Sequence, residues 1–461
     1  MADATIDILV TGGLVAIDDT VEAATVAIRH GRIVDILDAG ARPPAAATID
    51  AGGLHVLPGL IDTHVHTRHP GIAEREDFRS GTAAAAAGGI TTLFEMPISK
   101  VPANSADGVR RRVAAMSGEA HIDFALYGGA GHENLDRIAE QADAGVVAFK
   151  TFLQPPPPTR LDEFFGLWCT DYLALRSVMA AVASTGRRHC FHCEYTPMFQ
   201  ALQGELEAAG RRWGRAHAES RPPIVEEIAV AMVLALAADT GASVGVVHCS
   251  SARSARLVAD ARARGIDAVA ETCPPYLFFT DEALDRLGPF AKCNPPLRSA
   301  DGVREMWRAL EAGQIDYIGT DHSPFTEEDK TRAADDIFQA PPGLCGLDVM
   351  APLMLTAVAE GRLTLPGMVA LCSTRAAEVF GLADKGRIAP GADADLTFVD
   401  LDARWTYHSR HAFTRSKANM AIYDGVPMRG RVMSTFVRGV RVFDDGAITG
   451  PPGHGRFVRP A

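Results

Sequence analysis

Leu57-Pro58-Gly59-Leu60-Ile61-Asp62-Thr63-His64-Val65-His66 is an apolar run that ends in two histidines. The residues that follow the Pro-Gly pair predict a β-strand that ends near Val65. Because side chains alternate along a strand, His64 and His66 face the same side and can bind one metal ion together. The segment therefore predicts a strand whose carboxyl end carries chemically active side chains.

Short apolar runs of this kind recur along the middle of the chain and alternate with helix-like segments. In the segment from Pro223 to Ala238, for example, apolar residues recur at roughly helical spacing. Eight strands are expected, ending near Val65, Phe94, Tyr127, Phe149, Phe191, Val247, Ala270 and Ile318. Alternating strands and helices favour a parallel sheet. Eight such units predict an α/β fold with a (β/α)8 barrel over residues 56–380.

Both ends of the chain have a different texture, in which short β-rich runs are broken by glycine. Examples are Asp7-Ile8-Leu9-Val10 and Thr25-Val26-Ala27-Ile28 near the beginning, and Asp395-Leu396-Thr397-Phe398-Val399 near the end. This spacing suits antiparallel strands joined by tight turns. We expect residues 1–55 and 381–461 to pair into one composite β-sandwich domain beside the barrel.

Composition limits the possible partners and location. The chain has 461 residues and a net charge of −12, with 45 Lys and Arg against 57 Asp and Glu, which argues against a nucleic-acid surface. The longest strongly apolar helical stretch, Ile228 to Ala238, has 11 residues, whereas about 20 are needed to cross a bilayer. Eight cysteines in so long a chain do not form a disulfide framework, and Met1-Ala2-Asp3-Ala4 lacks the basic region of a secretory signal. We therefore expect a cytoplasmic protein that binds neither nucleic acid nor membranes.

Three later strands also end in potential metal ligands. His192 follows the run that ends at Phe191, His248 follows Val247, and Asp321 stands shortly after Ile318. In a parallel barrel the carboxyl ends of all strands open onto one face, so distant residues can meet there. Together with the first two histidines they form a plausible zinc-binding set.

Lys150, in Val146-Val147-Ala148-Phe149-Lys150-Thr151, is the least ordinary member of this set. A lysine at the end of an apolar strand is unfavourable to bury in its charged form and tends to lose its proton. A neutral amine can react with carbon dioxide to give a carbamate, whose two oxygens can bridge two cations. The alternative is an ion pair with Glu194 or Asp321.

These residues, in this order on successive strands, resemble the binuclear form of the amidohydrolase superfamily. Further motifs resemble its cyclic amidohydrolases, a group of allantoinases, dihydroorotases, hydantoinases and dihydropyrimidinases. They are Gly88-Gly89-Ile90-Thr91-Thr92, Glu95-Met96-Pro97, Glu271-Thr272-Cys273-Pro274, Lys292-Cys293-Asn294-Pro295-Pro296-Leu297-Arg298 and Lys385-Gly386-Arg387-Ile388-Ala389-Pro390-Gly391. The similarity extends over nearly the whole chain.

The resemblance implies a set of roles. His64, His66 and Asp321 would bind one divalent metal ion, His192 and His248 the other, and N6-carboxylated Lys150 would bridge both; zinc is the expected metal. Two cations lower the pKa of a bridging water toward ~7, so that hydroxide can attack the amide carbon of a cyclic substrate. Asp321 is then the expected catalytic base, which passes the proton to the departing ring nitrogen.

Candidate substrate contacts point in two directions. Arg68 matches the arginine with which dihydroorotases bind a substrate carboxylate, and a planar bidentate donor suits that task. Asn294 also fits the dihydroorotase pattern. Ile98 and Phe325, however, stand where that group has an asparagine and a histidine.

Hydantoinases typically have a tyrosine five residues after the bridging lysine, where this chain has Pro155. Allantoinases lack that tyrosine, and Glu95-Met96-Pro97 and Asp321-His322-Ser323-Pro324 look most like theirs, although Ser99 replaces an asparagine of their motif. The sequence thus favours an allantoinase-like enzyme that opens a small cyclic amide or ureide, with dihydroorotase and hydantoinase or dihydropyrimidinase as alternatives.

Two other classes of protein fit these residues less well. A catalytically inactive dihydropyrimidinase-like scaffold would have substituted ligands, whereas all six ligand positions carry competent residues here. A mononuclear deaminase would not need the strand-end lysine. Relatives in the group are commonly oligomers, so the resemblance implies a homodimer or homotetramer.

Overall fold

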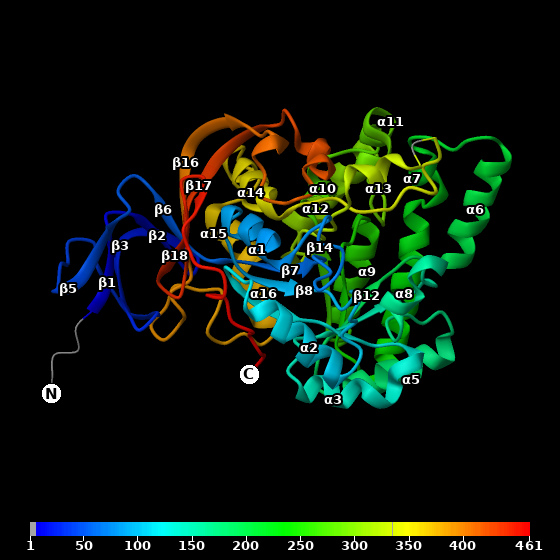
Figure 1. The fold of residues 1–461 in the computed structure, drawn as a ribbon, viewed down its shortest axis with the longest axis horizontal. Helices are drawn as coiled ribbons and strands as arrows, with labels where there is room; N and C mark the ends of the chain where they lie inside the picture. The colour runs from blue at the N-terminus through cyan, green and yellow to red at the C-terminus, as the bar shows by residue number, and fades with distance from the viewer. Residues whose placement is uncertain (1–5, 334) are drawn as a thin grey trace.

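The computed structural model describes residues 6–333 and 335–461, so the opening segment from Met1 to Ala4 lies outside the described residues. Strands from both ends of the chain lie on one side of the molecule, and helices surround a second set of strands on the other side (Figure 1). The expected mixed α/β class is confirmed.

Within the described residues, the middle of the chain contains parallel strands in two hydrogen-bonded sets, β7 to β9 and β10 to β15. Their bounds are β7 (Leu60–Val65), β8 (Ile90–Glu95), β9 (Asp123–Leu126), β10 (Gly128–Gly129), β11 (Phe149–Phe152), β12 (His189–His192), β13 (Val244–Val246), β14 (Ala268–Thr272) and β15 (Tyr317–Ile318). Their side chains are buried on both faces, as expected for strands covered by helices.

Backbone contacts connect the two sets at both of their edges. Next to β9, the N–H of Val147 donates to the carbonyl of Leu126 at 3.0 Å. At the other edge, Val65 of β7 forms a parallel bridge with His322, and the N–H of His66 donates to the carbonyl of His322 at 2.8 Å. The first parallel strand is therefore a neighbour of the segment that follows the last one.

Most strands end within two residues of the predicted position, but β11 differs. It begins at Phe149, where the sequence predicted its end, and continues to Phe152. The reason is its pairing, because Thr151 and Phe152 remain in register with Phe191 and His192 of β12. The partner strand, rather than the local sequence, sets where β11 ends.

Helices follow most of these strands and begin at identifiable caps. The Asp77 side chain accepts from Ser80 at the start of α1, and α8 begins at Pro223 and ends before Gly241, whose φ is 70°. The bounds are α1 (Phe78–Ala87), α2 (Ala106–Ser117), α3 (Ile138–Asp143), α4 (Leu161–Phe164), α5 (Tyr172–Ala183), α6 (Thr196–Ala208), α7 (Ala216–Ser220), α8 (Pro223–Thr240), α9 (Ala252–Ala263), α10 (Pro274–Phe278), α11 (Glu282–Leu287), α12 (Ala300–Glu311), α13 (Glu327–Thr331), α14 (Met350–Ala359), α15 (Leu365–Val369) and α16 (Arg375–Val379).

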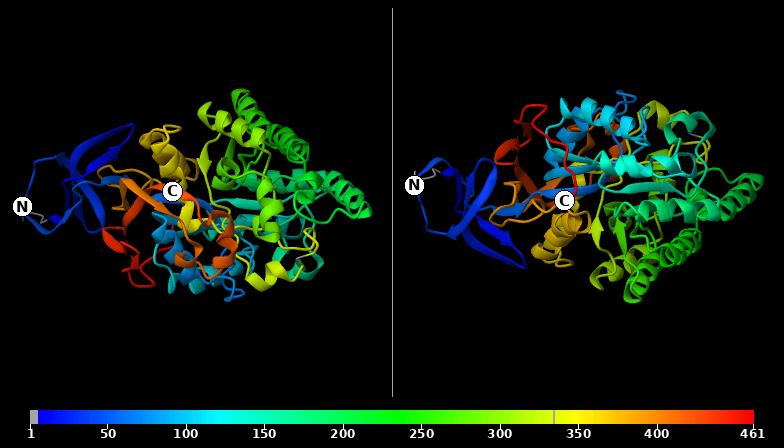
Figure 2. Two further views of the ribbon diagram at one scale, coloured as in Figure 1. Left: turned by 90° about the horizontal axis from the view of Figure 1, so that it is seen from above. Right: turned by 90° about the horizontal axis from the view of Figure 1, so that it is seen from below.

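Strands from the two ends of the chain share one ten-stranded sheet, seen at one end of the molecule in both views of Figure 2. They are β1 (Ile6–Thr11), β2 (Leu14–Ile17), β3 (Thr20–Arg29), β4 (Arg32–Asp38), β5 (Ala45–Asp50), β6 (His55–Pro58), β16 (Leu396–Thr406), β17 (Pro427–Val437), β18 (Val440–Asp444) and β19 (Ala447–Ile448). The two ends meet where β6 pairs antiparallel with β16. A buried cluster that includes Val26, Val56, Leu396 and Phe436 packs against this junction.

A buried ionic cluster links the end of the chain to the parallel strands. The Lys385 ammonium contacts Asp123 of β9 at 2.6 Å, Asp393 at 2.9 Å and Asp395 at 2.7 Å. Arg438 also pairs with Asp123. We call these five residues the Lys385 cluster.

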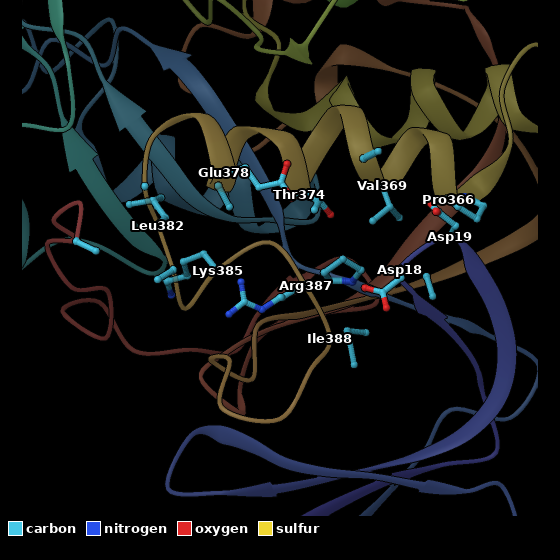
Figure 3. Close-up of a pocket in the computed structure, with 17 residues that line it drawn as sticks. Asp18, Asp19, Pro366, Val369, Thr374, Glu378, Leu382, Lys385, Arg387 and Ile388 are labelled. Atoms are coloured by element: carbon cyan, nitrogen blue, oxygen red, sulfur yellow. The ribbon is translucent and has the colours of Figure 1, made fainter. Parts of the chain in front are cut away.

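Several cavities lie away from the predicted metal ligands. One of about 570 Å³ is lined by Asp18 and Asp19 after β2, by the segment of α15 and α16, and by Arg387. Figure 3 shows Thr374 and Glu378 on the helical side of this cavity and Arg387 on the facing loop. None of the described helices is both long and apolar enough to span a membrane.

Candidate active site

Six predicted ligands stand at or just beyond the carboxyl ends of four parallel strands and within a fifth. His64 is in β7 and His66 follows it, Lys150 is in β11, His192 ends β12, and the remaining two follow β13 and β15: they are His248 and Asp321. Because the carboxyl ends of parallel strands lie at the same edge, the fold brings residues up to 257 positions apart to one place.

The first three ligands form a compact triangle. The Nε2 atoms of His64 and His66 are 3.2 Å apart, and each lies 3.3 Å from Oδ1 of Asp321. Two ligand atoms at about 2.0–2.1 Å from a tetrahedral zinc ion are roughly 3.3 Å apart. The donor atoms are therefore spaced as a single metal ion requires.

The other two histidines form a second pair beside this triangle. Nδ1 of His192 and Nε2 of His248 are 3.0 Å apart. The ring of His248 lies 4.7 Å from that of His192 and 5.2 Å from that of His64, measured between centroids. The four imidazoles thus form one continuous row.

Lys150 is fully buried, and its Nζ has no hydrogen-bond partner among the residues that the structure describes. Burial lowers the pKa of Lys150, although the nearby carboxylates of Asp321 and Glu271 act in the opposite direction. Its Nζ lies 5.1 Å from the ring of Phe152, which in turn lies 5.6 Å from the ring of His192. The Lys150 charge lowers the pKa of His64 and His248. The alternative prediction, an ion pair of Lys150 with Glu194 or Asp321, is wrong for the described structure, because Glu194 pairs with Arg221 instead and no salt bridge forms at Nζ.

The backbone is strained where these ligands are presented. His248 and Asp321 have φ angles of 41° and 50°, and Arg68 has 58°. Residues other than glycine in this left-handed region cost of order 1–3 kcal/mol each, and such positions concentrate at functional sites. Three of the eight predicted site residues therefore carry a conformation that local sequence preference would not select.

Comparison with known proteins agrees with this geometry. The family model described as "Amidohydrolase family" matches residues 55–442. An allantoinase from Deinococcus radiodurans is 37% identical over 457 residues, which cover 99% of each chain. The chain belongs to the amidohydrolase family.

Other relatives of this amidohydrolase fall in the group that the sequence motifs resemble. An allantoinase from Rubrobacter xylanophilus is 38% identical and an L-hydantoinase from Paenarthrobacter aurescens is 33% identical, each over 98% of both chains. The solved L-hydantoinase (dihydropyrimidinase) from Arthrobacter aurescens has a TM-score of 0.93 at 32% identity, covering 99% of this chain and 100% of its own. The dihydropyrimidinase from Brevibacillus agri NCHU1002 has a TM-score of 0.90 at 27% identity, covering 98% of both chains.

Glu271 is a fully buried carboxylate that was not predicted as a site residue. It contacts both groups of histidines in this amidohydrolase site. Its Oε1 lies 2.7 Å from Nδ1 of His64 and accepts from the N–H of His248 at 3.0 Å, and its Oε2 accepts from Thr63 at 2.6 Å. Burial raises the pKa of Glu271 to about 7, partly offset by these bonds. Its motif, Glu271-Thr272-Cys273-Pro274, was the only signal in the sequence.

A second carboxylate, Glu194, was not predicted as a site residue. It contacts His192 in the second histidine pair. Oε2 of Glu194 lies 2.8 Å from Nε2 of His192 and 2.8 Å from the Arg221 guanidinium. Because Glu194 follows His192 by two positions, strand alternation was the signal that could have placed it on the same face.

The histidines of this amidohydrolase are held in the form that binds metals. Burial, followed by the nearby Lys150 charge, lowers the pKa of His64 to about 3. Burial likewise lowers the pKa of His66 and His248 well below the usual range. Neutral imidazole is the form that can donate a lone pair to a cation.

The two predicted substrate contacts lie in different settings. Arg68 donates from Nη1 to the carbonyl of Pro324 at 2.9 Å and from Nη2 to Ser323 at 2.6 Å, and it stacks on Phe325 at 4.6 Å. Its Nε has no partner among the described residues. Burial lowers the pKa of Arg68 to about 9. Asn294 has a buried Oδ1 that likewise has no partner in the described part of the chain.

Proposed function

We propose that this amidohydrolase hydrolyses one C–N bond in the ring of a cyclic amide or ureide, with an allantoin-like ureide as the favoured substrate. The observations that carry the proposal are the two groups of histidines and the buried Nζ of Lys150, which has no partner among the described residues. The names of the full-length relatives, allantoinase and L-hydantoinase, support the same class of substrate.

The parallel strands form, in this proposal, a (β/α)8 barrel over residues 56–380, with a composite β-sandwich domain from residues 1–55 and 381–461. The links at both edges of the parallel strands support a closed barrel. The shared sheet of β6 and β16 supports the composite domain, and it also shows that β6 crosses the proposed boundary.

Two divalent metal ions fit the residues present. His64, His66 and Asp321 would hold one ion, and His192 and His248 the other. The Lys150 amine would add to carbon dioxide and lose one proton, and the resulting N6-carboxylated lysine would help to hold both ions. Imidazole nitrogen and carboxylate oxygen donors at these spacings suit zinc.

When bound, the two ions would lower the pKa of a water molecule and polarise the substrate carbonyl. The protein's own contribution to the chemistry is proton transfer by Asp321, whose side chain is 19% exposed while the histidines beside it are buried. The Asp321 carboxylate would take the proton from the attacking water and deliver it to the ring nitrogen as the C–N bond breaks. One water is consumed, and the product carries a new carboxylate.

The setting of Arg68 bears on the choice of substrate. Two of its five N–H donors already bond to Ser323 and Pro324, which leaves Nε as a buried, unpartnered donor. A dihydroorotase would use this arginine as a bidentate clamp for a substrate carboxylate. We propose instead that Nε of Arg68 donates to a neutral ring and that Oδ1 of Asn294 accepts from it, which favours allantoin or a hydantoin over dihydroorotate.

The test is a ring-opening assay with allantoin, dihydroorotate, dihydrouracil and substituted hydantoins, combined with elemental analysis. We expect about two zinc ions per chain, highest activity on allantoin or a hydantoin, and loss of activity in metal-free protein that returns with zinc and bicarbonate. Lys150→Met is the matched variant, because it retains length and burial but cannot form a carbamate. Metal-free protein with full activity, or a Lys150→Met variant with normal metal content and turnover, would contradict the proposal.

The proposed assembly, a homodimer or homotetramer, is separate from the catalytic proposal. Mass photometry of the purified chain distinguishes these two states from a monomer.

A further inference from the structure

Two histidines of the site are held by carboxylates, and they are held at opposite ring atoms. His64 is bonded through Nδ1 to Glu271 at 2.7 Å, whereas His192 is bonded through Nε2 to Glu194 at 2.8 Å. A neutral imidazole has one N–H and one lone pair, and a carboxylate can only accept. The proton therefore resides on the bonded nitrogen, and the opposite nitrogen keeps its lone pair.

In both rings the nitrogen left free is the one that faces the site. It is Nε2 of His64, which faces His66 and Asp321, and Nδ1 of His192, which faces His248 at 3.0 Å. The two carboxylates thus select different nitrogens in the two halves of the site. A flip of the His192 ring would remove its lone pair from the site.

The two carboxylates are themselves stabilised in different ways. Glu271 is fixed by neutral donors, the Thr63 hydroxyl at 2.6 Å and the N–H of His248 at 3.0 Å. Glu194 has a cation, because the Arg221 guanidinium lies 2.8 Å from the same Oε2 that contacts His192. Glu194 is only 1% exposed, and a buried carboxylate without such a partner would be strongly disfavoured.

Arg221 is in turn fixed by residues from several segments of the chain. It lies between α7 and α8, its guanidinium packs 3.8 Å above the ring of Phe199 in α6, and its carbonyl accepts a hydrogen bond from Arg298. Arg298 also donates to Ser250, two residues after His248. The segment that supplies Arg221 is thus tied to both histidines of the second pair.

We infer that Glu194 and Arg221 are positioning residues, which hold the Nε2–H of His192 and turn its Nδ1 toward His248. This inference rests on the proposed function, because the orientation of His192 matters only if that half of the site binds a metal ion. It predicts that the pair is specific to the His192 and His248 half and leaves the triangle of His64, His66 and Asp321 unaffected.

The test measures zinc stoichiometry and affinity by competition with a chelator in the zinc-loaded full-length protein. We expect Glu194→Ala to weaken one of the two zinc ions by about 10- to 100-fold, the usual range for a lost carboxylate partner of a ligating histidine, and to leave the other zinc unchanged. Arg221→Met should have the same pattern with a smaller effect. Because Arg221 acts through Glu194, the double variant should be no worse than Glu194→Ala alone.

A spectroscopic readout separates positioning from general damage. In protein labelled with 15N-histidine, the His192 resonances should show a proton on Nε2 and metal on Nδ1, with the assignment made by a His192→Asn variant. Arg438→Met is the matched control, since it removes an arginine from a buried carboxylate, Asp123, in the Lys385 cluster. It should lower the melting temperature and leave both zinc affinities and the His192 resonances unchanged.

The outcomes distinguish the inference from the proposed function. Wild-type protein that binds no zinc would overturn the proposed function itself. Wild-type protein with two zinc ions, together with Glu194→Ala and Arg221→Met variants of unchanged affinity or with equal loss of both ions, would overturn the role of the pair. If Glu194→Ala does not fold, Glu194→Gln carries the test with a smaller expected loss of about 10-fold, because its amide retains one acceptor oxygen.

Discussion

Two buried lysines of this amidohydrolase stand in opposite electrostatic settings. Lys385 is surrounded by the carboxylates of Asp123, Asp393 and Asp395 within 2.6–2.9 Å. Lys150 is just as deeply buried, yet its amine has no partner among the described residues. Burial lowers the pKa of Lys150, whereas the three carboxylates overcome the effect of burial and raise the pKa of Lys385.

The same contrast separates two groups of ligands that are geometrically able to hold a metal ion. Three aspartates in the Lys385 cluster lie as close together as His64, His66 and Asp321 do. Among the three aspartates, the Lys385 ammonium already occupies the position that a metal ion would take. Close acidic residues therefore do not by themselves indicate a metal site, and the informative feature is a buried polar group whose charge or lone pair is left uncompensated.

The largest expected effect is on catalysis at the proposed active site, where the Lys150 amine has no partner among the described residues. We expect Asp321→Asn to lower kcat about 10²- to 10⁴-fold, because it removes the group proposed to move the proton, and to leave the melting temperature nearly unchanged. Asp393→Asn is the matched control, because the Asp393 side chain is 13% exposed and the Asp321 side chain is 19% exposed. Steady-state kinetics and thermal melting of both variants provide the measurement. Near wild-type kcat in Asp321→Asn would remove this residue from the mechanism.

Exchange of the two lysines for methionine should produce opposite results. Lys385→Met leaves buried carboxylates without their cation and should lower the free energy of unfolding by about 3–5 kcal/mol, with metal content retained. Lys150→Met removes a buried amine, so it should keep or raise the melting temperature relative to metal-free wild-type protein, and it should fail to bind the metal ions. Denaturant or thermal unfolding together with elemental analysis checks both. A Lys150→Met variant that is as destabilised as Lys385→Met would contradict the contrast.

A third buried group extends the comparison to pH. Asp348 has an unpartnered Oδ2, and burial raises its pKa from 3.8 to about 6, although the N–H of Phe413 and the nearby His322 act in the opposite direction. Its contribution to stability is present below pH 3.8 and is lost as the pH rises through about 6, a change of about 3 kcal/mol.

We therefore expect Asp348→Asn to remove this pH dependence. The difference in unfolding free energy between wild type and variant should fall by about 3 kcal/mol between pH 3.5 and pH 7. Melting curves of both proteins across this range measure it, and effects of acid on the metal ligands cancel in the difference. A difference that does not vary with pH would show that folding does not raise the pKa of Asp348.

The smallest expected effect concerns Arg68, whose guanidinium already donates two hydrogen bonds within the protein. We expect Arg68→Ala to raise KM by about 10-fold for the best neutral ring substrate, consistent with loss of one hydrogen bond from a charged donor. The rise should be no greater for dihydroorotate. A selective loss on dihydroorotate would instead identify Arg68 as a carboxylate clamp and favour the dihydroorotase alternative.

The grouping of the proposed metal ligands could be predicted from sequence because each of these residues lies at or near the end of an apolar run. Strand alternation predicted that His64 and His66 face one side, and the shared edge of parallel strands predicted that His248 and Asp321 approach them. The end of β11 could not be predicted from its own sequence. This strand extends past its predicted end because Thr151 and Phe152 pair with β12.

The supporting groups could not be predicted, because their partners come from unrelated positions in the chain. Arg221 reaches Glu194 from the segment between two helices, and no local pattern marks it as a partner of a strand end. In the same way, Lys385 meets Asp123 across 262 positions, and only the folded chain shows that its charge is compensated.

The pairing of β6 with β16 has a consequence for how the protein is made. Pro58 of β6 lies opposite Leu396 of β16, so the N-terminal strands meet their partner only after the intervening chain has been synthesised. At about 5–20 residues per second, a ribosome needs roughly 20–70 seconds to make that segment. During this interval β6 has no β16 to pair with on the nascent chain, and the parallel strands have time to assemble first. The last strands then complete the sheet, so a chain truncated before β16 would leave the N-terminal strands exposed to chaperones and proteases.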